Sequence, residues 1–176
     1  MSRLESELER LRLWDQALCI RFNGAVRVAP VRRAFRVVSR LGDGVFWYAL
    51  MLALLATGGA AAFGAVGRMA GTGLACTLIY KWLKAKTLRP RPFAVESAVR
   101  AEADPLDQFS FPSGHTLHAV AFSIVAIAFY PLLAWLLVPF TLLVAMSRVV
   151  LGLHYPSDVL AGAALGALIA QGALAI

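Results

Sequence analysis

Three short polar strings in this sequence combine residue types that suit phosphoryl chemistry. They are Lys84 with Arg91-Pro92, then Pro112-Ser113-Gly114-His115, and Ser147-Arg148 followed by His154 and Asp158. Cations bind phosphate oxygens, and one histidine can attack phosphorus while a carboxylate orients it. A second histidine can protonate a leaving group. Together the strings predict a site that acts on a phosphate group.

The rest of the chain has the composition of a membrane protein. Of its 176 residues, 60% are hydrophobic and 15% are charged, and the mean hydropathy is +0.71. Soluble domains carry about a quarter charged residues. The length leaves room for one domain, residues 1–176. Residues 1–12 are charged and lack the apolar run of a cleavable signal peptide.

We expect an all-α integral membrane protein with about five membrane-spanning helices, because the apolar residues form long runs. The break at Gly42-Asp43-Gly44 precedes the first span, Arg68 ends it, and Pro131 marks a tight turn between the third and fourth. Small residues near the end of the chain would let helices approach closely, namely Gly162, Gly166 and Gly172. The expected spans are 45–66, 69–83, 113–130, 132–147 and 156–176, with a polar loop at 87–111.

Residues 1–40 are predicted to form an amphipathic segment on the membrane surface, ahead of a bundle at 45–176. The segment alternates charged with apolar residues and carries nine arginines. An arginine at the centre of a span costs about 2.5–3.5 kcal/mol, so this segment suits a surface better than a crossing. A solvated basic tail is the alternative interpretation.

All three polar strings fall on one face of the membrane in this arrangement. The first follows the second span, the second opens the third span, and the third joins the last two spans. Unrelated loops would share a side only by chance. The topology therefore predicts one site.

The chain resembles the type 2 phosphatidic acid phosphatase family. The family pattern of K-x6-R-P, P-S-G-H and S-R-x5-H-x3-D is matched at every specified position within residues 84–92, 112–115 and 147–158. The resemblance implies a membrane lipid phosphatase built as a helical bundle. It also implies hydrolysis of a phosphoric ester or pyrophosphate with no metal or other cofactor.

The resemblance implies three catalytic residues. His154 would attack phosphorus to form a phosphohistidine, which requires a neutral imidazole. Asp158 would hold the other ring N–H, as the carboxylate does in a serine triad. His115 would act as the general acid.

The resemblance also implies a set of residues that bind the substrate phosphate. Three cations would hold the equatorial oxygens, namely Lys84, Arg91 and Arg148. Ser113 and the Gly114 amide would add hydrogen bonds at the N-terminus of a helix, where the dipole favours an anion.

Other polar residues receive plainer interpretations. We expect a structural role for His118, which lies one turn beyond His115. Solvated positions are expected for two loop carboxylates, Asp104 and Asp107. Anchoring at the interface and headgroup binding fit three cations equally, namely Lys81, Lys86 and Arg89. Both cysteines, Cys19 and Cys76, are interpreted as buried packing residues.

The formal charge of +7 indicates an anionic partner, and lipid headgroups are the first candidates in a membrane. Nucleic acid is disfavoured because no polar basic face accompanies the charge. The compact form resembles bacterial undecaprenyl pyrophosphate phosphatases, so we expect conversion of undecaprenyl pyrophosphate to undecaprenyl phosphate. Phosphatidate, phosphatidylglycerol phosphate and lipid A phosphates stay open as substrates. Protein partners are left open by the sequence.

Two other functional classes fit part of this pattern. Vanadate-dependent haloperoxidases use a related histidine and cation site, but they are soluble, whereas this chain is mostly apolar spans. A non-catalytic lipid-binding protein on the same bundle would be expected to lose the nucleophile or its orienting acid. His154 and Asp158 are both present.

We expect a multi-pass protein of the bacterial inner (plasma) membrane, and its orientation is a matter of conflicting signals. The catalytic face carries 16 of the 17 Lys and Arg residues, with Arg68 alone on the other face. The positive-inside rule then favours a cytoplasmic site. Bacterial relatives usually act on the outer leaflet, and catalysis itself requires three of these cations. A periplasmic catalytic face is our expectation, with the cytoplasmic face left open.

Overall fold

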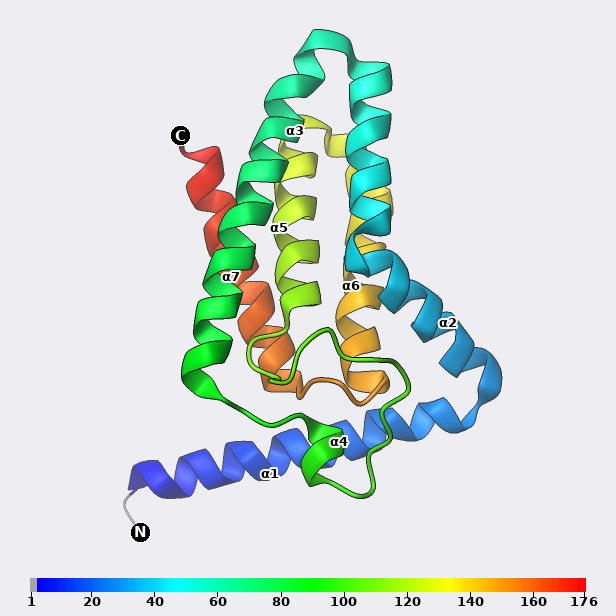
Figure 1. The fold of residues 1–176 in the computed structure, drawn as a ribbon, viewed down its shortest axis with the longest axis vertical. Helices are drawn as coiled ribbons and strands as arrows, with labels where there is room; N and C mark the ends of the chain where they lie inside the picture. The colour runs from blue at the N-terminus through cyan, green and yellow to red at the C-terminus, as the bar shows by residue number, and fades with distance from the viewer. Residues whose placement is uncertain (1–2) are drawn as a thin grey trace.

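The computed structural model describes residues 3–176, with the side chains of residues 3, 4 and 61 left aside. Residues 1 and 2 of the predicted surface segment therefore lie outside the described part of the chain. The described chain is all-helical (Figure 1). Its helices are α1 (Arg3–Asn23), α2 (Ala29–Arg40), α3 (Phe46–Thr87), α4 (Pro92–Val95), α5 (Gly114–Phe129), α6 (Ala134–Val150) and α7 (Pro156–Leu174).

The helix α3 is a hairpin of two long arms. Its 42 residues are interrupted at Gly59, where φ is +56° and ψ is −144°. Figure 1 shows the chain reversing direction there, at the end of the molecule far from α1. A positive φ of this kind suits glycine, which lacks a Cβ. The arms, residues 46–58 and 60–87, take the place of the two spans predicted at 45–66 and 69–83.

The turn between these two spans differs from the predicted one. We expected Arg68 to end the first span, but the break lies at Gly59. Arg68 lies inside the second arm, and its guanidinium carbon is 5.5 Å from the centre of the Phe129 ring. Contact with an aromatic face lets this cation stay within a helix, so its charge does not mark a helix end.

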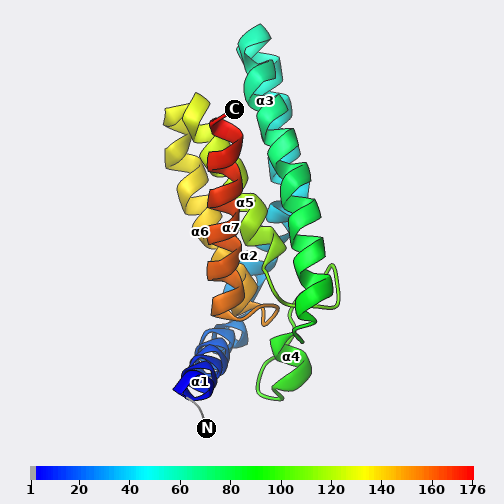
Figure 2. The same cartoon turned by 90° about the vertical axis from the view of Figure 1, so that its left-hand side faces the viewer.

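The helix α5 is surrounded by α3, α6 and α7 (Figures 1 and 2). The 3₁₀ turn Pro131–Leu133 joins it to α6, which confirms the tight turn predicted at Pro131. α7 approaches α5 through two glycines. A Cβ added to Gly162 would lie 2.6 Å from the Ser113 carbonyl oxygen, and one added to Gly166 would lie 2.4 Å from the Leu117 carbonyl oxygen. A Cβ on Gly172 would meet nothing within 4 Å. The predicted close approach therefore holds for the first two glycines and is wrong for Gly172.

Four stretches are long and apolar enough to cross a membrane, namely Ala29–Ala60, Ala62–Val95, Pro131–Val150 and Pro156–Leu174. The helix α5 is shorter, at 16 residues, and is covered by its neighbours. These helices make the chain a membrane protein, with the apolar core of the bundle built around Trp47, Leu117 and Phe122.

The N-terminal segment is divided into two helices with different placements. α1 runs across one end of the bundle, whereas α2 rises obliquely and continues through the kink at Leu41–Val45 into α3 (Figure 1). α2 packs against α6, and its Arg36 pairs with Glu102 at 2.6 Å. Placement of α1 on the membrane surface stays a prediction, whereas α2 is part of the first candidate span, Ala29–Ala60. The loop between α3 and α5 lies beside α1 at the same end of the bundle, where the polar strings meet (Figure 2).

Candidate active site

The three polar strings meet at one cavity of about 460 Å³. Its lining combines polar and apolar side chains. The polar string residues in the lining are Lys84, Arg91, Gly114, His115, Arg148 and His154. The apolar lining residues include Trp47, Met51, Leu74 and Phe122. The structure therefore brings together the residues that the sequence placed on one face of the membrane.

His154 lies in the short turn between α6 and α7 and is 2% exposed. Its Nε2 atom is 3.3 Å from Nη1 of Arg91. A guanidinium only donates, so Nε2 accepts and carries the lone pair, which leaves the ring proton on Nδ1. Nδ1 faces the Asp158 Oδ2 atom at 3.6 Å, beyond hydrogen-bond distance, and has no other partner in the described chain.

The surroundings of His154 keep its imidazole neutral. Burial lowers the pKa of this ring well below its ordinary value. Three cations nearby lower the pKa further, namely Arg148, Arg91 and Lys84. A neutral ring with its lone pair on Nε2 is what a nucleophile requires, and here that lone pair accepts from Arg91.

We call Lys84, Arg91 and Arg148 the phosphate clamp. In the structure the first two members share a carboxylate: Asp107 Oδ1 lies 2.6 Å from Lys84 Nζ and 2.8 Å from Arg91 Nη2. Burial raises the pKa of Asp107, but the hydrogen bond and charge of Lys84, with the charge of Arg91, outweigh it and lower the pKa below its usual range. Asp107 is thus ionised between two cations.

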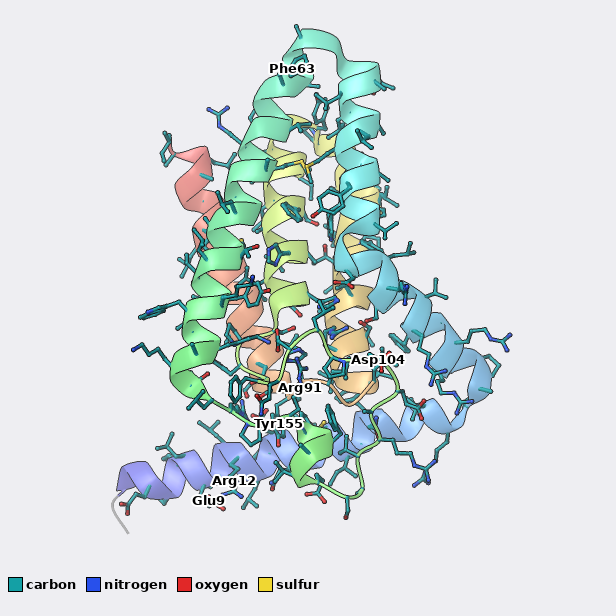
Figure 3. All side chains as sticks on the ribbon, in the orientation of Figure 1. Glu9, Arg12, Phe63, Arg91, Asp104 and Tyr155 are labelled. Atoms are coloured by element: carbon teal, nitrogen blue, oxygen red, sulfur yellow. The ribbon has the colours of Figure 1, made fainter. Side chains whose placement is uncertain are left out.

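This pairing corrects the interpretation of the loop carboxylates. Asp107 was expected to be solvated, yet it is held in the clamp by Lys84 and Arg91. The reason is the fold of the loop, which turns back over the cavity and brings Asp107 beside two cations that are otherwise buried. Asp104 is exposed, as predicted (Figure 3).

Arg148 completes the clamp from the last turn of α6. Its side chain is buried at 2% exposure, and Nη1 donates a hydrogen bond to the Ser39 hydroxyl of α2. Its Nε has no hydrogen-bond partner in the described chain. A buried guanidinium with an unused N–H favours binding of an anion, because leaving the donor unpaired is costly.

His115 and Ser113 differ in how they face the cavity. His115 lines it, and its Nε2 atom lies 3.6 Å from Oδ1 of Asp43, a residue in the kink before α3. Ser113 is fully buried behind the wall, where its hydroxyl pairs with Thr116 at 3.0 Å. Hydrogen bonding of Ser113 to phosphate therefore stays a prediction, while Gly114 lies at the wall itself.

His118 lines the cavity, and it also makes contacts of the kind expected for a structural role. Its Nδ1 lies 2.8 Å from the Gly114 carbonyl oxygen, and its Nε2 lies 3.1 Å from the Thr77 hydroxyl. These contacts tie the start of α5 to α3. Cys19 and Cys76 are buried free thiols, as expected.

Sequence reasoning missed the role of two charged residues beside Asp158. Arg89 donates to Asp158 Oδ1 at 2.6 Å and to Asp15 of α1 at 2.8 Å. The interfacial and headgroup roles considered for Arg89 do not describe this position. The repeated Arg-Pro dipeptide at residues 89–92 was the available signal, whereas nothing in the sequence pointed to Asp15.

Residues 46–176 match the sequence model of the PAP2 superfamily. The chain belongs to this superfamily. The match runs from α3 to α7 and contains all three polar strings, which confirms the resemblance found in the sequence.

Curated relatives share parts of this stretch. The chain is 38% identical over 89 residues to undecaprenyl-diphosphatase BcrC of Bacillus subtilis, covering 51% of this chain and 46% of the relative. It is 39% identical over 74 residues to decaprenylphosphoryl-5-phosphoribose phosphatase of Mycobacterium tuberculosis, covering 41% and 40%. It is 41% identical over 58 residues to lipid A 1-phosphatase of Rhizobium johnstonii, covering 33% of this chain and 24% of the relative. The matched stretch spans less than half the length of each relative.

Two solved structures share the fold. The PAP2 type phosphatidylglycerolphosphate phosphatase from Bacillus subtilis superposes with a TM-score of 0.75 over 94% of this chain and 85% of that chain. LpxE of Aquifex aeolicus superposes with a TM-score of 0.78 over 91% of this chain and 94% of that chain. Both are 24% identical to this chain, so these likenesses establish the all-helical membrane fold alone.

Proposed function

We propose that this protein is a metal-independent membrane lipid phosphatase that works through a phosphohistidine on His154. The observation that carries the proposal is the single cavity shared by the His154 lone pair, His115 and the phosphate clamp. Membership of the PAP2 superfamily and the phosphatase names of the curated relatives support it.

In the first step the His154 Nε2 lone pair forms a bond to phosphorus while the bond from phosphorus to the leaving oxygen breaks. Protonated His115 gives its proton to that oxygen. The phosphate clamp stabilises the charge on the other phosphate oxygens. The imidazole becomes positively charged, and Asp158 lies on its far side to stabilise that charge.

In the second step a water molecule attacks the phosphohistidine. Neutral His115 takes up one proton of that water, so it returns to its starting protonation state. The bond from phosphorus to nitrogen breaks, and its electron pair returns to Nε2 of His154. Inorganic phosphate then leaves.

The favoured substrate is undecaprenyl pyrophosphate, with attack on the terminal phosphorus and undecaprenyl phosphate as the leaving group. Apolar side chains line the same cavity as the clamp, so an isoprenoid tail can contact them while its phosphate binds the clamp. The names of two relatives denote polyprenyl substrates. Lipid A phosphates, phosphatidate and phosphatidylglycerol phosphate are the alternatives, and the first of them is supported by the name of the third relative.

Phosphate release by the purified protein tests this function. The assay uses detergent micelles containing EDTA and offers each of the four lipids, with His154→Ala beside the wild type. We expect release that EDTA does not stop, that is lost in the variant, and that is fastest with undecaprenyl pyrophosphate. Release from none of the lipids would contradict the proposal and favour a non-catalytic lipid-binding role.

We propose further that the catalytic end faces the periplasm of a bacterial inner membrane. Ser97 is exposed in the loop at this end, and Phe63 is 68% exposed at the opposite end (Figure 3). Because both native cysteines are buried, Ser97→Cys and Phe63→Cys offer single accessible thiols. In intact spheroplasts a membrane-impermeant maleimide should label only the first variant. Labelling of only the second would place the site in the cytoplasm.

We also propose that α1 lies on the membrane surface and forms one domain with the bundle. Arginines and exposed apolar side chains alternate along it, the latter including Leu8, Leu11 and Trp14 at 58%, 65% and 66% exposure. A helix of this composition suits the interface. In vesicles, lipids brominated near the headgroup should quench Trp14 fluorescence more strongly than lipids brominated near the bilayer centre, with the other tryptophans replaced by Phe.

A further inference from the structure

Arg89 lies between two carboxylates at the end of the bundle beside α1. Its Nη1 donates to Asp158 Oδ1 at 2.6 Å, and its Nη2 donates to Asp15 Oδ2 at 2.8 Å. Asp158 is fully buried and Asp15 is 7% exposed. Asp15 comes from α1, Arg89 from the loop after α3, and Asp158 from the first turn of α7. Three distant parts of the chain thus meet in one charged row.

Arg89 fixes one side of the Asp158 carboxylate. The other oxygen, Oδ2, accepts the Tyr155 backbone N–H at 2.9 Å and faces His154 Nδ1 at 3.6 Å. A small rotation of the carboxylate would carry Oδ2 away from the histidine or toward it. The hydrogen bond from Arg89 therefore sets the angle at which Asp158 faces the nucleophile.

Asp15 fixes Arg89 in turn. Its carboxylate accepts from Arg89, from the Ser157 backbone N–H at 2.9 Å, and from the Ser157 hydroxyl. The Arg89 guanidinium carbon also lies 4.2 Å from the centre of the Tyr155 ring, which holds its plane. Without Asp15, the second arm of the guanidinium has no carboxylate partner.

We propose that Asp15 and Arg89 are positioning residues for the reaction, holding Asp158 toward His154 and making α1 a working part of the active site. The inference rests on the proposed phosphohistidine function. It extends beyond the family match, because Asp15 lies outside residues 46–176. Residues that orient a ligand or catalytic group from behind it typically change affinity or activity 10–100-fold when mutated, as is known around metal sites.

The competing explanation is that the row only docks α1 on the bundle. A buried ion pair adds little net stability, but removal of one partner destabilises because the other charge stays buried and unpaired. A docking role would lower the melting temperature and leave the turnover of the folded protein unchanged. A positioning role lowers kcat in folded protein and leaves KM nearly constant, because none of these residues lines the cavity where the lipid would bind.

The test compares purified full-length variants in the phosphate-release assay with undecaprenyl pyrophosphate. Asp15→Asn keeps the shape and removes the charge, Arg89→Gln removes the donor pair, and Arg89→Lys keeps the charge without the fork. The matched controls are Glu9→Gln and Arg12→Lys. These residues pair with each other at 3.8 Å on the exposed face of α1 (Figure 3).

We expect kcat to fall at least tenfold in Asp15→Asn and Arg89→Gln, with KM within twofold of wild type and both controls unchanged. Arg89→Lys should retain more activity than Arg89→Gln. The Asp15→Asn/Arg89→Gln double variant should be no slower than Arg89→Gln alone, because Asp15 acts through Arg89. If Arg89→Gln does not fold, the test uses kcat and KM of Asp15→Asn and Asp15→Glu instead.

Wild-type kcat in Asp15→Asn, or losses that multiply in the double variant, would overturn the inference. His154→Ala separates this failure from failure of the proposed function. An inactive His154→Ala with a fully active Asp15→Asn refutes only the positioning role. A fully active His154→Ala refutes the phosphohistidine function itself.

Discussion

Gly162→Ala should lower activity by displacing the start of α5, which packs against α7 at Gly162. The added Cβ would lie 2.6 Å from the Ser113 carbonyl oxygen and 3.5 Å from the Leu117 amide nitrogen. Both are backbone atoms, which cannot move aside as a side chain does. Because ordinary contact begins at 3.4 Å, the start of α5 must shift by about 0.8 Å.

Such a shift displaces His115, which is two residues from Ser113. Overpacking of this kind costs about 1–3 kcal/mol of stability. Misplacement of a catalytic group by about 1 Å can cost 10²-fold in rate. We therefore expect Gly162→Ala to fold, to melt at a lower temperature and to lose about 10²-fold in kcat.

Thermal unfolding and phosphate release in micelles measure both effects. Gly172→Ala is the matched control on the same helix, because a Cβ there meets nothing within 4 Å. Alanine favours a helix over glycine by about 1 kcal/mol, so this control should be neutral or slightly stabilising. Wild-type kcat and melting temperature in Gly162→Ala would refute the tight α5–α7 geometry.

Three further predictions concern the charges of the site. Arg148→Lys keeps the charge but loses the planar fork, so kcat should fall about 10²-fold in the phosphate-release assay, and a wild-type rate would show that the fork is not used. Asp107→Asn removes the carboxylate that pairs with Lys84 and Arg91. The inhibition constant of inorganic phosphate should therefore fall about tenfold, which is about 1.4 kcal/mol of binding free energy. Weaker inhibition would mean that Asp107 orients the clamp. Because the folded-state pKa of His154 is depressed by burial, the unfolded chain binds a proton that the folded chain does not. Stability should therefore fall as pH drops below the ordinary histidine value of about 6.5, and melting curves of His154→Ala should show a shallower fall.

The sequence was sufficient to predict the parts that follow regular patterns. The apolar runs predicted the bundle, Pro131 predicted the turn before α6, and Pro156 predicted the start of α7. The three polar strings meet at one cavity because helix lengths place their ends on one side. These features follow from residue types close together in the sequence and from the lengths of the helices.

Contacts between distant segments were not predictable in the same way. The charge of Arg68 predicted the end of the first span wrongly, because the ring of Phe129 comes to lie beside Arg68 only when α3 and α5 pack. Asp107 and Arg89 find their partners only after the loop folds back over the cavity. The pairing of Asp15 with Arg89 spans 74 residues, and no periodicity marks it.

Trapping of the covalent intermediate tests the central claim most directly. Wild type and His115→Ala would be mixed rapidly with undecaprenyl pyrophosphate radiolabelled at the terminal phosphorus and then denatured in alkali. We predict alkali-stable, acid-labile label on a peptide containing His154. In His115→Ala this label should form more slowly and also decay more slowly, because the first step lacks its acid and the second step lacks its base. Label on no peptide in an actively hydrolysing sample, or label that persists in His154→Ala, would contradict the phosphohistidine mechanism.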